Sequence, residues 1–155
     1  MAKRRRNNKA ANKNPQSAIN PTRRKQPFAG APSEQDNVAQ ISWRVSMMDL
    51  DGRWSFDGAI TKRVLDKLAH FEKKTVDEWT SARGSQKVLK RIPVENLCAE
   101  AQKRLQQIRR DDVDELWEFH LNARQRIWCV RYESTMYLLW WDPDHQVCPS
   151  ALRNT

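Results

Sequence analysis

The chain has 155 residues, of which 28 are Lys or Arg and 19 are Asp or Glu, so its formal net charge is +9. This length is enough for one domain, and a hydrophobic content of 39% can form a modest core. Nine of the basic residues and none of the acidic ones lie in residues 1–26, which leaves 19 basic residues to balance the 19 acidic ones. The positive charge therefore belongs to the N-terminal segment and does not indicate a folded body that binds nucleic acid.

The cysteines and the apolar runs indicate the compartment. Three cysteines are an odd number, and their spacing matches neither a disulfide framework nor a zinc site, so we expect free thiols in a reducing compartment. No apolar h-region of a secretory signal follows the basic N-terminus, and the longest apolar run, residues 136–141, is too short to span a bilayer. We expect a cytoplasmic protein without membrane contact, bound metal or cofactor.

Residues 1–37 consist mainly of Asn, Lys, Arg, Pro, Ala and Ser. Such a segment cannot bury enough surface to offset the entropy of ordering, so we predict a disordered basic arm followed by a single domain over residues 38–155. The arm can serve solubility, or it can contact RNA, DNA or the ribosome through non-specific electrostatics. Its candidate nucleic-acid-binding residues are Lys3, Arg4, Arg5, Arg6, Arg23, Arg24 and Lys25.

The stretch after the arm predicts a strand, a turn region and a helix. Residues 38–45 alternate well enough for a strand with Ile41, Trp43 and Val45 on one face. Two Asp-Gly pairs within residues 49–58 are typical of turns. An amphipathic helix follows, because apolar residues recur at helical spacing with Lys and Arg between them. Its predicted buried stripe is Ile60, Val64, Leu65, Leu68 and Phe71.

Two further helices are expected before the C-terminal sheet. Thr75 and Glu78 match a capping box, in which the hydroxyl and the carboxylate satisfy free backbone N–H groups at the start of a helix. Residues 85–91 are basic and without periodicity, so we expect an irregular segment. Pro93 suits the first turn of a third helix. The predicted buried stripe of this helix is Leu97, Ala101, Leu105 and Ile108.

Residues 114–149 contain three runs rich in aromatic and aliphatic side chains, separated by two short polar breaks. This pattern is typical of consecutive antiparallel strands. Together with the preceding elements it predicts an α+β fold. The expected order is an N-terminal strand, two to three helices and a three-stranded antiparallel meander.

This order of elements, with a final meander rich in Arg and aromatic residues, resembles the RelE/ParE superfamily of small bacterial toxins. The words R-I-W at residues 126–128, L-L-W-W-D-P-D-H at 138–145 and V-C-P-S at 147–150 are also similar to those of uncharacterised small bacterial and phage proteins. In RelE-type toxins an arginine that opens the third strand stabilises negative charge on RNA, and a His or Tyr after the last strand assists proton transfer. The matching residues here are Arg126 and His145. The resemblance implies RNA or the ribosome as target and a cognate antitoxin as partner.

The residues that share a face with Arg126 depend on the loop before it, because a slip of one residue turns every side chain over. A three-residue loop at residues 123–125 places Glu118, His120 and Trp128 on the face of Arg126. The opposite, core face then consists of Trp117, Phe119, Leu121, Ile127 and Cys129. A two-residue loop would place Arg126 among the core aromatics, which is costly for a charge, so we favour the first register.

Metal-independent RNA cleavage needs a base, an acid and cations for the phosphorane charge. The candidate catalytic residues are Arg126, His145, Glu118 and His120, and Trp128 is a candidate contact to nucleic acid. Each also has a structural interpretation. Glu118, His120 and Arg126 can form a cross-strand ion cluster, and His145 can simply belong to the turn that ends the last strand.

The sequence therefore favours a toxin-like protein that acts on RNA or the translating ribosome; if it is an enzyme, we expect a metal-independent endoribonuclease. The alternative is a non-enzymatic toxin, or an accessory protein of a phage or mobile element, that docks a partner through its Trp-rich sheet. Candidate residues that are exposed and mutually close would favour the enzyme. The same residues buried and paired, beside an exposed aromatic groove, would favour the binder.

Overall fold

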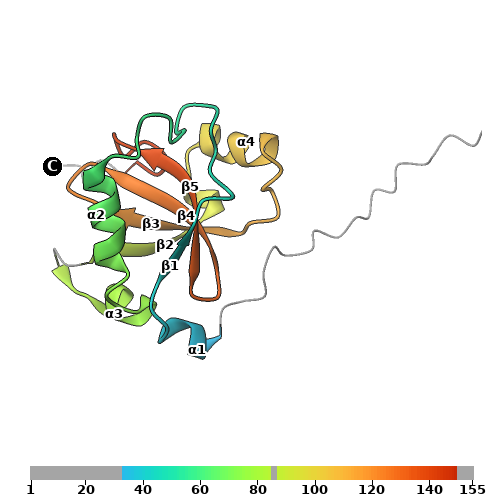
Figure 1. The fold of residues 1–155 in the computed structure, drawn as a ribbon. Helices are drawn as coiled ribbons and strands as arrows, with labels where there is room; N and C mark the ends of the chain where they lie inside the picture. Colours follow the sequence, from blue (N-terminus) through green and yellow to red (C-terminus); the bar gives the residue numbers. More distant parts are fainter. Residues whose placement is uncertain (1–32, 85–86, 150–155) are drawn as a thin grey trace, which may run out of the picture.

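The computed structural model describes residues 33–84 and 87–149 of the chain (Figure 1). In chain order the elements are α1 (Glu34–Asn37), β1 (Ser42–Arg44), α2 (Lys62–Phe71), α3 (Val76–Ser81), β2 (Leu89–Pro93), a 3₁₀ turn (Val94–Asn96), α4 (Ala99–Gln107), β3 (Glu115–His120), β4 (Arg126–Tyr132) and β5 (Thr135–Asp142). The α+β class predicted from the sequence is confirmed. In residues 33–84 and 87–149, no helix combines the length and the apolar character that a membrane crossing needs.

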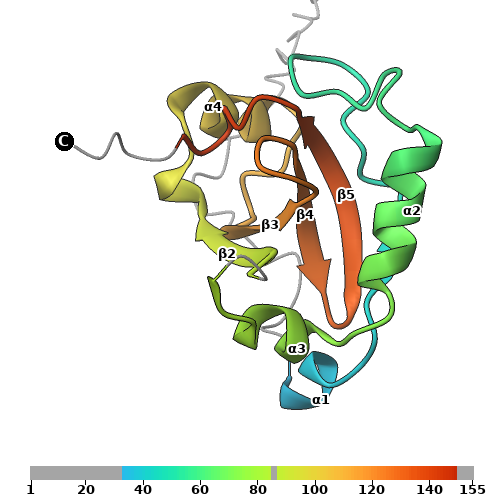
Figure 2. The same cartoon turned by 90° about the vertical axis from the view of Figure 1, so that its left-hand side faces the viewer.

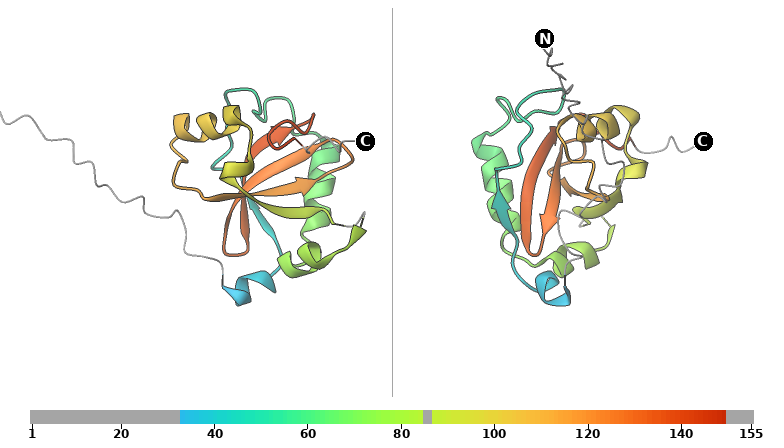
Figure 3. Two further views of the ribbon diagram at one scale, coloured as in Figure 1. Left: turned by 180° about the vertical axis from the view of Figure 1, so that it is seen from behind. Right: turned by 90° about the vertical axis from the view of Figure 1, so that its right-hand side faces the viewer.

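The strands form one five-stranded mixed sheet in the order β1-β5-β4-β3-β2. β3, β4 and β5 are antiparallel neighbours, β2 is antiparallel to β3, and β1 runs parallel to β5. The two edge strands thus come from earlier in the chain than the three strands between them (Figure 3). Parallel pairing requires a long connection between the strands, and most of the domain supplies it here.

One face of the sheet is covered by α2 and α3, whereas α4 lies on the opposite side (Figure 2). On the α2 side Phe71 is central, with its ring centroid 5.0 Å from that of Phe119 on β3 and 5.3 Å from that of Trp79 on α3. All three side chains are buried. Burial of each such side chain stabilises the fold by roughly 1.5–3 kcal/mol, so this aromatic group anchors both helices.

The other face packs on α4 and on the loop that precedes α2. Asp49, only 6% exposed, joins these two parts to the sheet. Its carboxylate accepts hydrogen bonds from Arg104 Nε at 2.7 Å and Nη2 at 2.6 Å on α4, and from Trp140 Nε1 at 3.0 Å on β5. Burial alone would raise the pKa of Asp49, but these hydrogen bonds outweigh it and hold the pKa below its ordinary value.

A β-bulge in β5 places two consecutive residues, Leu139 and Trp140, on the α4 side. The register shifts between Trp128 and Cys129, so that Trp128 pairs with Trp140 and Cys129 pairs with Leu138. Leu139 is left over on β5, and it packs with Trp140 in the core beneath α4. This irregularity explains why the run at residues 138–141 does not alternate in the way that a regular strand does.

Several predicted elements are found where the sequence placed them. The capping box of Thr75 and Glu78 begins α3, with Glu78 N donating to Thr75 Oγ1 at 3.2 Å and Thr75 N donating to Glu78 Oε2 at 2.8 Å. The first amphipathic helix is α2, capped by Thr61. Both Asp-Gly pairs form turns, and Gly52 and Gly58 have φ values of 88° and 65°, which favour glycine.

Two predictions about residues 85–93 are wrong. The basic segment contains an edge strand, β2, which pairs Leu89 with Phe119 and Arg91 with Trp117. Edge strands tolerate charged side chains, and for this reason the sequence showed no clear apolar alternation. Pro93 ends this strand and does not open a helix, because α4 begins six residues later at Ala99. Proline lacks the N–H that strand pairing needs, so the end of an edge strand suits it.

The predicted disordered arm extends too far at its C-terminal end. Residues 34–37 form the short helix α1, which begins with a capping box between Ser33 and Asp36. Asn37 at its end accepts a hydrogen bond through Oδ1 from Arg131 Nη2 at 2.7 Å. Local capping together with one contact to the sheet therefore orders a stretch whose composition alone suggested disorder.

Candidate functional site

The hairpin of β3 and β4 determines which predicted residues meet. His120 pairs with Arg126 and Glu118 pairs with Trp128, so the connecting loop has five residues, 121–125. The predicted three-residue loop is wrong. The difference in pairing is two residues, however, and a two-residue shift keeps every side chain on its face. Glu118, His120, Arg126 and Trp128 therefore do lie on one face, as expected.

All four candidate catalytic residues come together around one oxygen, Oε1 of Glu118. Arg126 Nε donates to it at 2.8 Å, His120 Nε2 lies 2.6 Å away, and His145 Nε2 lies 3.6 Å away. We call these four residues the Glu118 cluster. Glu118 is 2% exposed and Arg126 is 5% exposed, so both charges lie inside the protein.

The guanidinium of Arg126 is mostly used within the molecule. Nη1 donates to the backbone oxygens of Asn122 at 2.7 Å and Gln125 at 3.0 Å, and Nη2 donates to that of Ala123 at 3.2 Å. These three bonds and the bond from Nε to Glu118 use four of the five N–H groups that an arginine has. Arg126 thus closes the β3–β4 loop, and little donor capacity remains for a phosphate.

The two histidines hold different positions around the carboxylate. Nε2 of His120 is buried and forms no aligned hydrogen bond within the described part of the chain, although it lies 2.6 Å from Glu118 Oε1. The contact is therefore a close but bent electrostatic one. His145 lies in the turn after β5, where its φ of 56° is uncommon for a residue with a side chain.

Asp142 builds the turn that presents His145. Its Oδ1 accepts from Gln146 N at 2.9 Å, and its Oδ2 accepts from Val147 N at 2.9 Å and from Trp128 Nε1 at 3.4 Å. Asp142 is 0% exposed, so these backbone and indole donors are its environment. The sequence placed this residue in a turn signal, and the structure shows that it fixes the turn to the core.

Burial and charge set the protonation of the cluster. Burial alone would raise the pKa of Glu118, but His120, Arg126 and His145 outweigh it and hold the pKa below its ordinary value. Burial, followed by repulsion from Arg126, lowers the pKa of His145. At neutral pH the cluster therefore contains an ionised Glu118 and a neutral His145 that can accept a proton.

A cavity of about 370 Å³ lies beside the cluster, lined by His120, Asn122 and Arg126 from the hairpin and by Lys67 and His70 from α2. A small polar molecule can reach His120 from this side. Within the described ranges, no group of three or more His, Cys, Asp or Glu side chains is arranged to hold a metal ion. The cluster can thus donate or accept protons, but it has no metal-binding geometry.

The other predicted nucleic-acid contacts are not brought to this site. Trp128 is 0% exposed and presents no ring surface on which a base could stack. The basic residues from Lys3 to Lys25 (Lys3, Arg4, Arg5, Arg6, Arg23, Arg24 and Lys25) lie outside the described residues. All three cysteines are free, and Cys129 is a core residue, where burial raises the pKa of its thiol well above the ordinary value.

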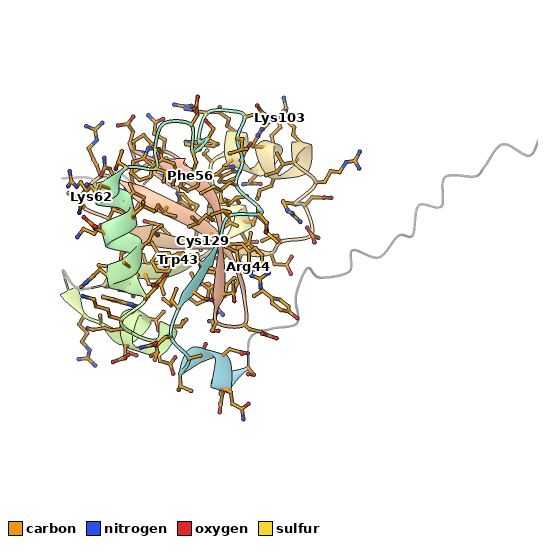
Figure 4. All side chains as sticks on the ribbon, viewed as in Figure 1. Trp43, Arg44, Phe56, Lys62, Lys103 and Cys129 are labelled. Carbon is orange, nitrogen blue, oxygen red and sulfur yellow. The ribbon has the colours of Figure 1, made fainter. Side chains whose placement is uncertain are left out.

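An apolar groove of about 470 Å³ runs between β1 and α2, and sequence reasoning missed it. We call it the β1–α2 groove; Trp43 on β1, which lines it, is labelled in Figure 4. Its lining residues are Trp43, Val45, Met48, Ile60, Leu65, Leu68, Ala69, Glu72 and Leu138. Ile60 and Leu65 belonged to the predicted buried stripe of the helix, but they are 43% and 52% exposed. That part of the prediction is wrong, because only Val64, Leu68 and Phe71 of the stripe are buried.

Trp43 forms the floor of this groove and is held rigidly. Its Nε1 donates to Leu68 O at 3.1 Å, and its ring centroid lies 4.9 Å from that of Phe119. Val45, which also lines the groove, is 63% exposed.

Comparisons of the chain with protein-family models, with curated proteins and with solved structures find no match.

Proposed function

We propose that the chain is a non-enzymatic protein-binding protein whose β1–α2 groove takes an amphipathic segment of a partner protein. The observation that supports this most is the exposure of Val45, Ile60 and Leu65 around a groove with a fixed aromatic floor. Exposed apolar side chains that gather over a concave surface mark interaction sites more often than scattered ones do. In the context of the RelE/ParE resemblance, the partner is an antitoxin or the target of a toxin.

The basic side chains on and directly after α2, which lie outside the groove lining, favour an acidic partner. From residue 62 to residue 74, α2 and its end carry five Lys or Arg against two acidic residues, Asp66 and Glu72. Lys62 pairs with Asp66 at 2.6 Å. Lys73 and Lys74, directly after the helix, add two positive charges. A segment with apolar residues at helical spacing and with acidic flanks complements both features.

The Glu118 cluster supports the same conclusion from the other direction. Its groups are buried and paired with one another, and Arg126 uses its donors on the β3–β4 loop. Catalysis on a phosphodiester needs donors that are free to meet developing charge. The cluster is therefore better suited to stabilising the hairpin than to gripping RNA.

Selection of displayed peptides on the purified protein tests the groove. We expect selected peptides to share apolar residues at spacings of three and four with acidic flanks, and to lose binding at least about tenfold to Leu65→Glu, which corresponds to about 1.4 kcal/mol. Leu50→Glu is the matched control, because Leu50 is 68% exposed and apolar but does not line the groove. Peptides that bind Leu65→Glu as well as the original protein would refute the docking proposal.

A second candidate, RNA cleavage, is favoured by one observation: Nε2 of His145, an imidazole whose pKa is lowered by burial, lies 3.6 Å from Oε1 of the ionised Glu118. Purified protein incubated with ribosomes and messenger RNA separates the two functions. If the cluster is catalytic, RNA is cut and His145→Asn abolishes the cutting while the protein stays folded. If binding is the function, RNA stays intact, and in cells that express the protein any growth arrest is relieved by Leu65→Glu and not by His145→Asn.

A further inference from the structure

Arg131 on β4 is a buried arginine on the α3 side of the sheet. It is 7% exposed, and its Nε donates to Glu133 O at 2.6 Å while its Nη2 donates to Asn37 Oδ1 at 2.7 Å. The guanidinium carbon lies 4.9 Å from the centre of the Trp117 ring. These neutral contacts hold the side chain in one orientation, and Nη1 has no hydrogen-bond partner among the described residues.

The lack of a counter-charge distinguishes Arg131 from the other largely buried arginines. Arg126 pairs with Glu118 at 2.8 Å and Arg104 pairs with Asp49 at 2.6 Å. No carboxylate of residues 33–84 or 87–149 comes within ion-pair distance of Arg131; Asp36, Asp77 and Glu115 attract it only from farther away. Burial of a charge without a close counter-charge is unfavourable, so an anion beside Arg131 would stabilise the folded state.

A cavity of about 440 Å³ gives an anion access to this arginine. Besides Arg131 and Asn37, it is lined by Lys87, Lys90 and Arg91 near or on β2, and by Asp77 and Glu115. Glu115 is already paired with Arg91 at 3.2 Å. Lys90 pairs with Glu118 across the sheet, so its side chain belongs to the other face. Lys87, Arg91 and Arg131 against Asp77 and Glu115 leave the cavity with a surplus of one positive charge.

We propose that this cavity is a binding site for a phosphate monoester, with the guanidinium of Arg131 as its buried anchor and Arg91 at its rim. A phosphate supplies the close counter-charge that Arg131 lacks, and a planar guanidinium suits its oxygens better than an ammonium group does. The cavity is large enough for a small ligand that carries the phosphate, such as a nucleotide. This site is separate from the β1–α2 groove and from the Glu118 cluster.

Thermal melting of the full chain at constant ionic strength tests the site, with inorganic phosphate, adenosine monophosphate and adenosine as probes. We expect phosphate and the monophosphate to raise the melting temperature along a saturating curve, and adenosine and added potassium chloride to have no such effect. Equal affinity for the two phosphates would identify free phosphate as the ligand. At least about tenfold tighter binding of the monophosphate would identify a nucleotide.

Variants at the rim keep the test independent of folding. Arg91→Ala removes a side chain that is 65% exposed, so the protein should melt normally without ligand, yet its affinity for phosphate should fall about tenfold. Arg131→Gln should abolish the effect altogether. Arg124→Ala, an exposed basic residue outside the cavity, is the control and should bind as the original protein does. All variants retain residues 1–32. If phosphate bound only to this basic segment, Arg91→Ala and Arg131→Gln would bind phosphate as tightly as the original protein, and this result would overturn the proposal. A chain that phosphate does not stabilise beyond potassium chloride would overturn it as well.

Discussion

Arg126 Nε donates to Glu118 Oε1 at 2.8 Å across the β3–β4 hairpin, and both side chains are almost completely buried. The pair joins two strands, and the remaining donors of Arg126 hold the carbonyls of the connecting loop. A buried ion pair of this kind depends on both partners, because each would otherwise leave a charge inside the protein without compensation.

Arg126→Met should therefore lower the free energy of unfolding by about 3–5 kcal/mol, the usual result of removing one partner of a buried pair. Urea unfolding followed by tryptophan fluorescence measures the change. Arg124→Ala is the control: its ion pair with Asp144 is exposed, and its loss should cost less than about 1 kcal/mol. The double variant Glu118→Leu with Arg126→Met should recover stability relative to Arg126→Met alone. Equal stability of the Arg124 and Arg126 variants would mean that the buried pair contributes nothing.

Stability should fall with acidification in two separate steps. The folded chain holds the pKa of His145 below its ordinary value of 6.5, so the unfolded chain binds that proton more readily and stability falls as the pH drops below 6.5. The pKa of Glu118 is also lowered, so the stability that it contributes is present above its ordinary value of 4.5 and is lost at lower pH. Urea unfolding at a series of pH values should show both steps. His145→Asn should remove the step near neutrality and keep the acidic one; a stability that rises on mild acidification would contradict this.

Phe119 should be among the most sensitive core positions. It is 0% exposed, and its ring lies 4.9 Å from Trp43 and 5.0 Å from Phe71, measured between ring centroids. Phe119→Ala should cost about 3–5 kcal/mol through the cavity that it leaves. Leu50→Ala, at an exposed apolar position, should change stability by no more than about 0.5 kcal/mol. Near-native stability of Phe119→Ala would show that the face assignment of β3 is inverted.

Asp49 should be essential for holding α4 to the sheet. Asp49→Ala removes the acceptor of Arg104 and of the buried Trp140 indole, and it should lower the free energy of unfolding by about 3 kcal/mol or more. Hydrogen exchange should report faster opening of α4 than of β3 and β4. Arg53→Ala is the control, because its ion pair with Glu100 on α4 is exposed on both sides. Unchanged protection of α4 in Asp49→Ala would refute the role assigned to this carboxylate.

Local sequence signals predicted those features that depend on few neighbouring residues. The capping box of Thr75 and Glu78 was recognisable because helix caps are made within four residues. The faces of β3 and β4 were predicted correctly although the predicted loop length was wrong. Side chains alternate between faces every two residues, so an error of two residues in the pairing leaves each side chain on its face. By contrast, β2 was missed because an edge strand needs few apolar residues and obtains its order from pairing with β3.

The sequence by itself determined the α+β class, the strands from residue 115 onward and the four residues of the Glu118 cluster as a chemically related set. Only the tertiary structure decided that this cluster is buried and internally paired, that Trp128 has no exposed surface, and that Leu65 and Ile60 line an open groove. Exposure depends on which elements cover each face of the sheet. That covering is set by packing between segments far apart in the chain, such as α4 on β5 and β1 beside β5, and such packing leaves no local pattern in the sequence.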